Sequence, residues 1–302
     1  MTSLPAIETF GLTKRYAKSR HLALNNLNLA VRSGEIYGFL GPNGAGKTTT
    51  IRLLMNFIQP TTGHATILNQ DVVRQSIDIH GHIGYLPGEI ALYSKMTGNQ
   101  LFDYLAGLQP VKSTQYLRGL ISRFQPDTKK KINELSKGNR QKLGIIQAFM
   151  HQPDVLILDE PTSGLDPLMQ EVFYELVRET KARGGTIFVS SHNLTEVQKM
   201  CDRVGFVRGG KLIAEQDIND LSQSTIQTYD IAFAGEAPIS KLKQLNHIKV
   251  ISNTPHHVTV TVRGELKNLL SLLGRCDVVS IEHRDINLED EFLKFYKGDK
   301  ER

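Results

Sequence analysis

Apolar residues are spaced in two different ways along the chain, and the spacing changes near residue 220. Before that point, short uninterrupted apolar runs such as VLIL (155–158) and TIFV (186–189) alternate with stretches of helical period such as residues 169–184. Uninterrupted runs of this length are typical of strands that are buried on both faces. Their alternation with helices predicts an α/β fold in which helices cover a mostly parallel sheet.

The N-terminal part of this region is rich in predicted strands. Residues 6–16, 22–31 and 35–41 have strand-forming sequences, and the third segment runs directly into a glycine-rich loop and a helix predicted over 48–58. From about residue 90 to 150 the period is mostly helical, with interruptions near Pro110 and Pro126. We therefore expect residues 1–220 to form one domain, with a β-rich N-terminal subdomain and a helical insertion.

Residues 221–302 follow a different order. Their pattern predicts strand, helix, strand, strand, helix and strand between about 225 and 283, and then a last helix over LEDEFLKFY (288–296). This order is compatible with a small ferredoxin-like α+β module, which we expect to be an accessory domain.

The composition is that of a globular protein. The 302 residues are 40% apolar and 22% charged, and no stretch approaches the roughly 20 apolar residues that cross a bilayer. The start, MTSLPAIETF, has neither the basic nor the apolar part of a signal peptide, so we expect a cytoplasmic protein. Cys201 and Cys276 stand far apart and outside any CxxC pattern, which favours a packing role for both.

The net charge of +5 is unevenly distributed. Residues 220–302 hold 11 Lys or Arg and 12 Asp or Glu, whereas residues 1–219 hold 25 and 19. The basic excess of the first part suits a nucleotide or an anionic membrane surface, or is simply a solvated face. The run KKK (129–131) is too short to indicate nucleic acid, which we do not expect as a partner.

The strongest motif is GPNGAGKT at residues 41–48, which matches G-x-x-x-x-G-K-[ST] between a predicted strand and a predicted helix. In such a loop backbone N–H groups wrap phosphate oxygens, Lys47 reaches the outer phosphates and Thr48 can hold Mg²⁺. A glycine turn with an incidental lysine is the alternative, but the position after a strand favours nucleotide. The predicted nucleotide-binding residues are Gly41, Pro42, Asn43, Gly44, Ala45, Gly46, Lys47, Thr48 and Thr49.

Two adjacent carboxylates, Asp159 and Glu160, end the apolar run 155–158. At such a strand end Asp159 can hold Mg²⁺ and Glu160 can orient or deprotonate a water that attacks a phosphate. Neighbouring side chains on a strand point to opposite faces, so both can act only where the strand passes into its loop.

A second anion site is predicted at LSKGN, residues 135–139. Ser136 can cap the helix that follows, and Gly138 lets backbone N–H groups approach a ligand. The motif alone does not say which phosphate it binds.

Together these motifs resemble the ATP-binding subunits of ABC transporters over nearly all of residues 4–218. LSKGN resembles the family's signature motif, and SGLD (163–166) resembles the D-loop, which includes Asp166. His192 matches the switch histidine, and Tyr16 matches the aromatic residue that stacks on adenine, although either could be a packing residue. The residues after 220 resemble the C-terminal extensions of export-type subunits.

The resemblance implies that the chain hydrolyses ATP. Lys47 and Mg²⁺, held by Thr48 and Asp159, are expected to neutralise the phosphates, Glu160 to act on the water, and His192 to hold the γ-phosphate. It also implies that two cassettes pair head to tail, so that Ser136 and Gly138 contact the ATP of a second ATP-binding subunit.

The implied further partner is a multispanning membrane subunit, contacted near residues 85–104, with the chain peripheral on the inner face of the cell membrane. The implied function is to power a transporter, in particular an exporter. The alternatives are a soluble ABC ATPase that acts on nucleic acid or ribosomes and, further off, a P-loop kinase.

Two departures from the family pattern stand out. Gly88, in GYLPGE, occupies the place of the usual Q-loop glutamine, and whether neighbouring Glu89 replaces it is open. Lys137 and Asn139 replace a glycine and a glutamine of the usual signature.

Overall fold

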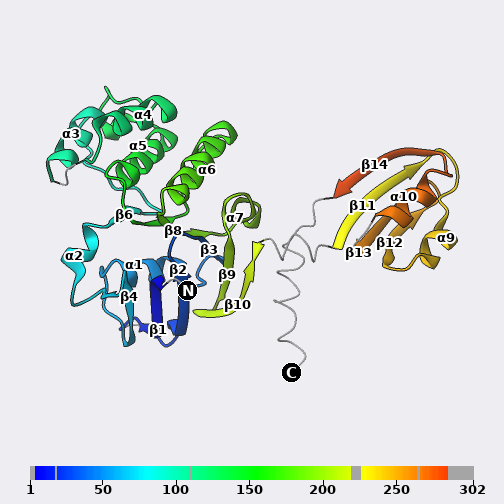
Figure 1. Cartoon of the computed structure of the whole chain (residues 1–302), viewed down its shortest axis with the longest axis horizontal. Coiled ribbons are helices and arrows are strands. Elements are labelled where there is room, and N and C mark those ends of the chain that lie inside the picture. The colour runs from blue at the N-terminus through cyan, green and yellow to red at the C-terminus, as the bar shows by residue number, and fades with distance from the viewer. Residues whose placement is uncertain (1–3, 18, 109–110, 219–225, 264–265, 285–302) are drawn as a thin grey trace. The chain divides into compact units, whose positions relative to one another are not determined.

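The computed structural model describes residues 4–17, 19–108, 111–218, 226–263 and 266–284. The chain forms two compact units, which divide between residues 218 and 219 (Figure 1). The first unit has an α/β fold with two sheets, and the second is a small α+β unit.

The first unit opens with an antiparallel sheet. Its strands are β1 (Pro5–Arg15), β2 (Leu22–Arg32), β4 (Thr62–Ile67) and β5 (Gln70–Asp71), in the order β2-β1-β4-β5. The sheet buries an apolar face that includes Ile7, Leu27 and Ile67. Strands β4 and β5 were not among the elements expected from the pattern, since TGHATI has little apolar alternation and β5 has two residues.

The second sheet has six strands in the order β10-β9-β3-β8-β7-β6. Their bounds are β3 Ile36–Leu40, β6 Ile83–Leu86, β7 Val155–Asp159, β8 Thr186–Ser191, β9 Arg203–Arg208 and β10 Lys211–Asp217. All neighbours are parallel except β9 and β10, which form a hairpin. Every residue of β3, β7 and β8 is buried, which confirms the expectation of a covered parallel sheet.

Helices cover both faces of this sheet. In Figure 1, α5 (Lys137–Phe149) and α6 (Pro167–Ala182) lie above it, and α1 (Lys47–Leu54) lies below it with the antiparallel sheet. Helix α7 (Leu194–Met200), which the pattern did not show, packs on β3 and β8. Helix α1 ends four residues earlier than predicted, because the chain turns at Asn56, whose φ is 53°.

The helical insertion lies between β6 and β7. It contains α3 (Gly98–Leu108), α4 (Thr114–Phe124), a 3₁₀ turn at Ile132–Glu134 and α5, and the short α2 (Ser76–His80) precedes β6. Within the described residues no helix is both long and apolar enough to cross a membrane.

The second unit comprises β11 (Ile226–Phe233), α9 (Ile239–Gln244), β12 (Ile248–Thr254), β13 (His257–Arg263), α10 (Lys267–Leu273) and β14 (Val278–Arg284). The sheet order β12-β13-β11-β14, with antiparallel pairs, is that of a ferredoxin-like module, as the element order indicated. The helix predicted at 288–296 lies outside the described residues.

The topology gathers several of the predicted site residues at one edge of the parallel sheet. Strands β3, β7 and β8 run parallel, with Leu40 opposite Ser191 and Asp159 opposite Ser190. Their carboxyl ends, and the loops that follow, therefore lie side by side, where open α/β sheets bind their ligands.

Candidate active site

The phosphate-binding motif forms the loop between β3 and α1, as predicted. Lys47 is the first residue of α1, and its side chain is only 6% exposed. Its amine donates to the Gly41 carbonyl at 2.7 Å and lies 3.3 Å from Glu160 Oε1. The loop lines a cavity of about 210 Å³ together with Thr48, Thr49 and Glu160. A buried cation beside N–H groups at a helix start can accommodate phosphate oxygens.

Asp159 is the last residue of β7 and is 2% exposed. Its carboxylate accepts hydrogen bonds from Thr48 Oγ1, at 3.0 Å, and from the Ser190 hydroxyl. The two residues predicted to hold a metal are therefore already adjacent. The sequence analysis missed Ser190, a polar residue at the end of an apolar strand.

Glu160 shows how two consecutive carboxylates reach one site. Its φ of 49° is left-handed, and its N–H donates to the Ser190 carbonyl at 3.2 Å. The chain thus leaves the strand at once, and Asp159 and Glu160 line the same cavity, of about 510 Å³. The expectation that the strand must end here is confirmed.

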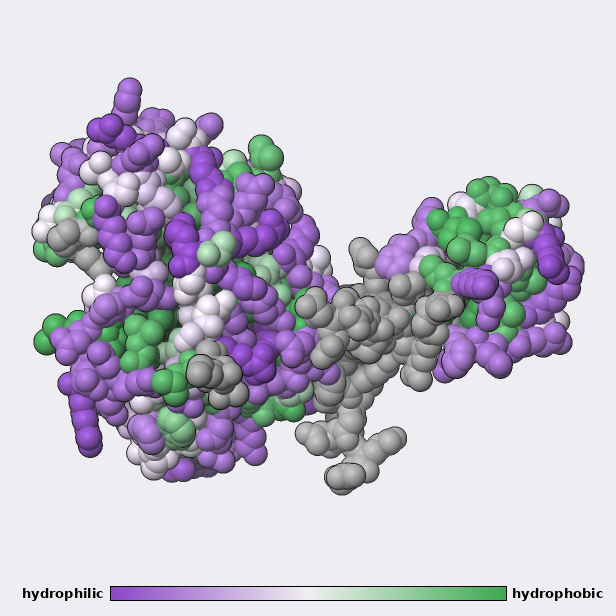
Figure 2. All heavy atoms as spheres, in the orientation of Figure 1, coloured by the Kyte–Doolittle hydropathy of each residue, from purple (hydrophilic) through white to green (hydrophobic). Residues whose placement is uncertain are grey.

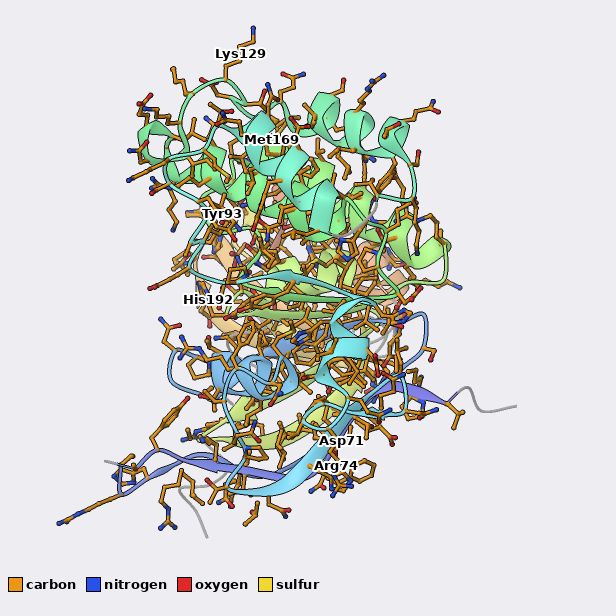
Figure 3. The ribbon with its side chains drawn as sticks, turned by 90° about the vertical axis from the view of Figure 1, so that its left-hand side faces the viewer. Asp71, Arg74, Tyr93, Lys129, Met169 and His192 are labelled. Atoms are coloured by element: carbon orange, nitrogen blue, oxygen red, sulfur yellow. The ribbon has the colours of Figure 1, made fainter. Side chains whose placement is uncertain are left out.

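His192 follows β8 directly and points to Glu160. Its Nδ1 lies 2.7 Å from Glu160 Oε2, while the ring itself is 62% exposed. Figure 3 places His192 at the level of the sheet. The glutamate thus stands between the Lys47 amine and the His192 imidazole, an arrangement that fixes both of its oxygens.

Tyr16 lies just beyond β1, beside the start of α1. Its hydroxyl is 3.4 Å from Thr49 Oγ1, and the residue is 38% exposed. The Lys14 amine lies 5.6 Å from the ring centroid. The aromatic ring is therefore next to the phosphate loop and open to solvent.

The signature residues are arranged differently. Ser136 caps α5, and its hydroxyl accepts from the Asn139 N–H at 3.3 Å. A Cβ on Gly138 would lie 2.8 Å from the Gly164 carbonyl oxygen, so the D-loop backbone requires glycine there. Lys137 donates to Ser163 Oγ at 3.0 Å. In the described part of the chain, Ser136 and Gly138 line neither cavity of the phosphate loop.

Asp166 also has a structural task, since it caps α6 by accepting from the Met169 N–H at 3.0 Å. It too lies outside both cavities. A further link between α5 and the segment after Glu160 was not predicted. The buried Gln141 donates to the Pro161 carbonyl at 2.7 Å. A lone polar residue on an apolar helix face was its only sequence signal.

Gly88, which stands at the place of the usual Q-loop glutamine, lies beside the Asp159 carboxylate. A Cβ at this position would be 3.3 Å from Asp159 Oδ2, and Glu89 lines the larger cavity with Asp159 and Glu160. Tyr85 lines it as well, and burial, aided by the Asp159 charge, raises the pKa of its phenol.

Similarity to known proteins identifies the family. The family model described as "ABC transporter" matches residues 24–163. The chain is 32% identical to the bacitracin transport ATP-binding protein BcrA of Bacillus licheniformis, over 97% of both chains. It is 31% identical to the Nod factor export ATP-binding protein I of Burkholderia orbicola, again over 97% of both.

A solved structure has the same fold. It is the dimeric post-hydrolysis state of the ATP-binding cassette MJ0796 bound to ADP and Pi, with a TM-score of 0.63 and 22% identity, over 70% of this chain and 98% of that one. The phosphate loop, the paired carboxylates and the relatives that align over 97% of both chains all indicate the same family. The chain belongs to the ABC transporter family as an ATP-binding subunit, an ATPase whose ATP hydrolysis powers transport.

Proposed function

We propose that ATP is hydrolysed at the site around Lys47, Glu160 and His192, and that the chain powers export through a separate membrane subunit. The observation that carries the proposal is the chain of contacts from Lys47 through Glu160 to His192 beside the phosphate loop. In a nucleotide complex the phosphates would take the place of the carbonyls that now hold the Lys47 amine.

The residues present fit a magnesium ion. Thr48 and Asp159 offer a hydroxyl and a carboxylate oxygen 3.0 Å apart, and Mg²⁺ prefers oxygen ligands of this kind. When bound with ATP, Mg²⁺ would supply positive charge to the β- and γ-phosphates.

Glu160 is the proposed base. Its carboxylate accepts a proton from the water that attacks the γ-phosphate, and the contact from His192 Nδ1 keeps the carboxylate turned into the cavity. Lys47 stabilises negative charge on the transferred phosphoryl group. The ring of Tyr16 supports adenine by stacking.

The signature acts on a second subunit. Ser136 and Gly138 stand at the start of the 13-residue helix α5, outside the cavities of their own phosphate loop. We assign them, with Asp166 of the neighbouring D-loop, to the γ-phosphate side of the ATP held by a partner cassette. Such an arrangement closes the dimer with ATP and opens it after hydrolysis.

The membrane subunit would dock between β6 and the helical insertion. Two cavities of about 250 and 340 Å³ lie there, and both are lined by Leu105 and Gln147. The exposed Tyr93 and Tyr104 pack edge to face beside them. Figure 2 shows apolar surface on the side where α2 and β6 lie in Figure 1. This docking places the chain on the inner face of the cell membrane.

The export direction rests on the C-terminal unit and on the relatives, one of which is named for export. The test is to purify the tagged chain from gently solubilised native membranes and to identify its partners by mass spectrometry. A multispanning protein in stoichiometric amount supports the proposal. Recovery of ribosomes or nucleic acid with a soluble chain would contradict it.

The direction of transport needs a second step. The purified complex is placed in vesicles with the cassettes facing outward, where added ATP reaches them. Cargo that accumulates inside the vesicles upon ATP addition indicates export, and ATP-driven loss of cargo from the vesicles would indicate import.

A further inference from the structure

The turn between β9 and β10 packs on the back of the phosphate loop. The Gly210 N–H donates to the Ala45 carbonyl at 2.9 Å, and the Gly210 carbonyl accepts from the Asn25 N–H, also at 2.9 Å. The turn therefore joins the phosphate loop to β2 through backbone groups alone. It belongs to none of the motifs that the sequence analysis singled out.

The space between these three segments has no room for a side chain. A Cβ on Gly210 would lie 2.7 Å from the Ala23 carbonyl oxygen and 2.8 Å from Leu24 Cα. A Cβ on Gly46 would lie 2.9 Å from the same Ala23 oxygen and 3.4 Å from Gly210 Cα. Two glycines thus face each other across the start of β2, and their lack of side chains permits the hydrogen bonds.

The hairpin also touches the other end of the loop. A Cβ on Gly41 would overlap the Val207 carbonyl oxygen of β9. Both ends of the phosphate loop therefore rest on one hairpin.

The contact to Ala45 has a direct consequence for phosphate binding. A trans peptide is planar, so the carbonyl of Ala45 and the N–H of Gly46 point in opposite directions. Gly210 holds the Ala45 carbonyl on the side of the loop that faces the hairpin. The Gly46 N–H is therefore turned to the opposite side, where the loop lines its cavity. A hydrogen bond to the carbonyl also polarises the peptide and makes the N–H a stronger donor.

We propose that Gly210 is a positioning residue for ATP: its N–H fixes the Ala45–Gly46 peptide so that the Gly46 N–H faces the phosphates. The hairpin turn is then part of the structure that determines ATP affinity, although it does not touch the nucleotide itself.

The neighbouring glycine provides a matched control. Gly209 and Gly210 both have left-handed backbones, with φ of 53° and 75°, so alanine is strained at either position. A Cβ on Gly209 would meet nothing within 4 Å. Alanine at Gly209 adds backbone strain alone, whereas alanine at Gly210 also pushes the turn away from Ala45.

The experiment measures the Kd and KM for ATP and kcat on the full chain. Gly210→Ala should raise the Kd and KM for ATP about tenfold, because small displacements at a bound phosphate are costly, and lower kcat much less. With Gly209→Ala, the Kd and KM for ATP should stay within about twofold of the unchanged chain, and thermal stability should fall less than with Gly210→Ala. Equal Kd values for the two variants would overturn the proposal.

A measurement on the unchanged chain covers the case in which Gly210→Ala does not fold. Hydrogen exchange of the Gly210 amide should slow when a non-hydrolysable ATP analogue with Mg²⁺ saturates the site, because ATP stiffens the loop that this amide holds. A peptide from β13 in the second unit serves as the control. Exchange at Gly210 that does not respond to the analogue would refute the positioning role.

Discussion

The phosphate loop and the signature, the two parts of the cassette that we propose to contact ATP phosphates, differ in how far one chain completes them. At the phosphate loop, Lys47 and Asp159 are 6% and 2% exposed, and both make hydrogen bonds within the chain. At the signature, Ser136 and Lys137 are exposed, and their described contacts serve to cap α5 and to hold the D-loop.

The difference shows where each function can be tested. A site whose charged groups are buried and already paired is preorganised, so single substitutions in one chain should disable it. A surface whose groups are exposed becomes a site only when a second subunit covers it. The effect of substitutions at the signature should therefore be measured in dimers that combine two different variants.

The largest effect is expected at Glu160. Glu160→Gln should lower kcat about 10²- to 10³-fold, because an amide cannot take a proton from water. ATP binding and the ATP-dependent dimer should persist, which equilibrium binding and size-exclusion chromatography measure. Glu175→Gln, a carboxylate on the exposed side of α6, is the matched control. Normal turnover in Glu160→Gln would mean that another group is the base.

Dimers that combine a phosphate-loop variant with a signature variant test whether the two motifs act across the dimer. Lys47→Ala and Ser136→Asp should each abolish most turnover alone, the second because its carboxylate still caps α5 but repels the partner's γ-phosphate. A one-to-one mixture should regain about a quarter of normal turnover, since half of the dimers are mixed and have one intact site of two.

The controls for mixed dimers are simple. Ser136→Asn caps the helix without adding charge, so its ATP turnover should fall far less than that of Ser136→Asp. A mixture as inactive as its components would show that signature and phosphate loop act within the same chain.

A smaller effect is expected at Tyr16. Tyr16→Ala should raise the KM for ATP about threefold to tenfold through lost stacking and leave kcat nearly unchanged. Tyr16→Phe should behave like the unchanged chain, because the hydroxyl contact to Thr49 is long, at 3.4 Å. If steady-state kinetics showed that Tyr16→Phe raises the KM for ATP as much as Tyr16→Ala does, the hydroxyl rather than the ring would contribute to ATP binding.

The smallest effect is expected at Lys137. Lys137→Ala removes one exposed hydrogen bond to Ser163, so the free energy of unfolding should fall by less than about 0.5 kcal/mol in urea titrations. A loss of several times this size would show that the signature end is held as firmly as the phosphate loop.

Sequence reasoning found the parts of the site that are contiguous in the chain. The loop 41–48 and the pair Asp159 and Glu160 carry their chemistry in their spacing, so their positions followed once strand ends were recognised. The sheet order of the second unit agreed with the alternation of its elements.

What could not be predicted depends on contacts between distant segments. Gly210 and Ala45 are far apart in the chain, and the sequence RGGK (208–211) indicates a hairpin turn without showing what the turn contacts. Likewise, Gln141 gave no sign that its amide reaches Pro161, and Ser190 gave none that it holds Asp159. Their partners are set by packing, which local propensity does not encode.

Glu160 combines a strained backbone with a carboxylate that makes two contacts inside the site. A side chain at a φ of 49° costs about 1 kcal/mol or more relative to glycine. Replacement by glycine would relieve that backbone cost, but it would also remove the carboxylate that pairs with the buried Lys47 amine and with His192. A laboratory selection for heat resistance therefore gains nothing simple from glycine at this position, because the carboxylate proposed to serve ATP turnover also holds Lys47 in place.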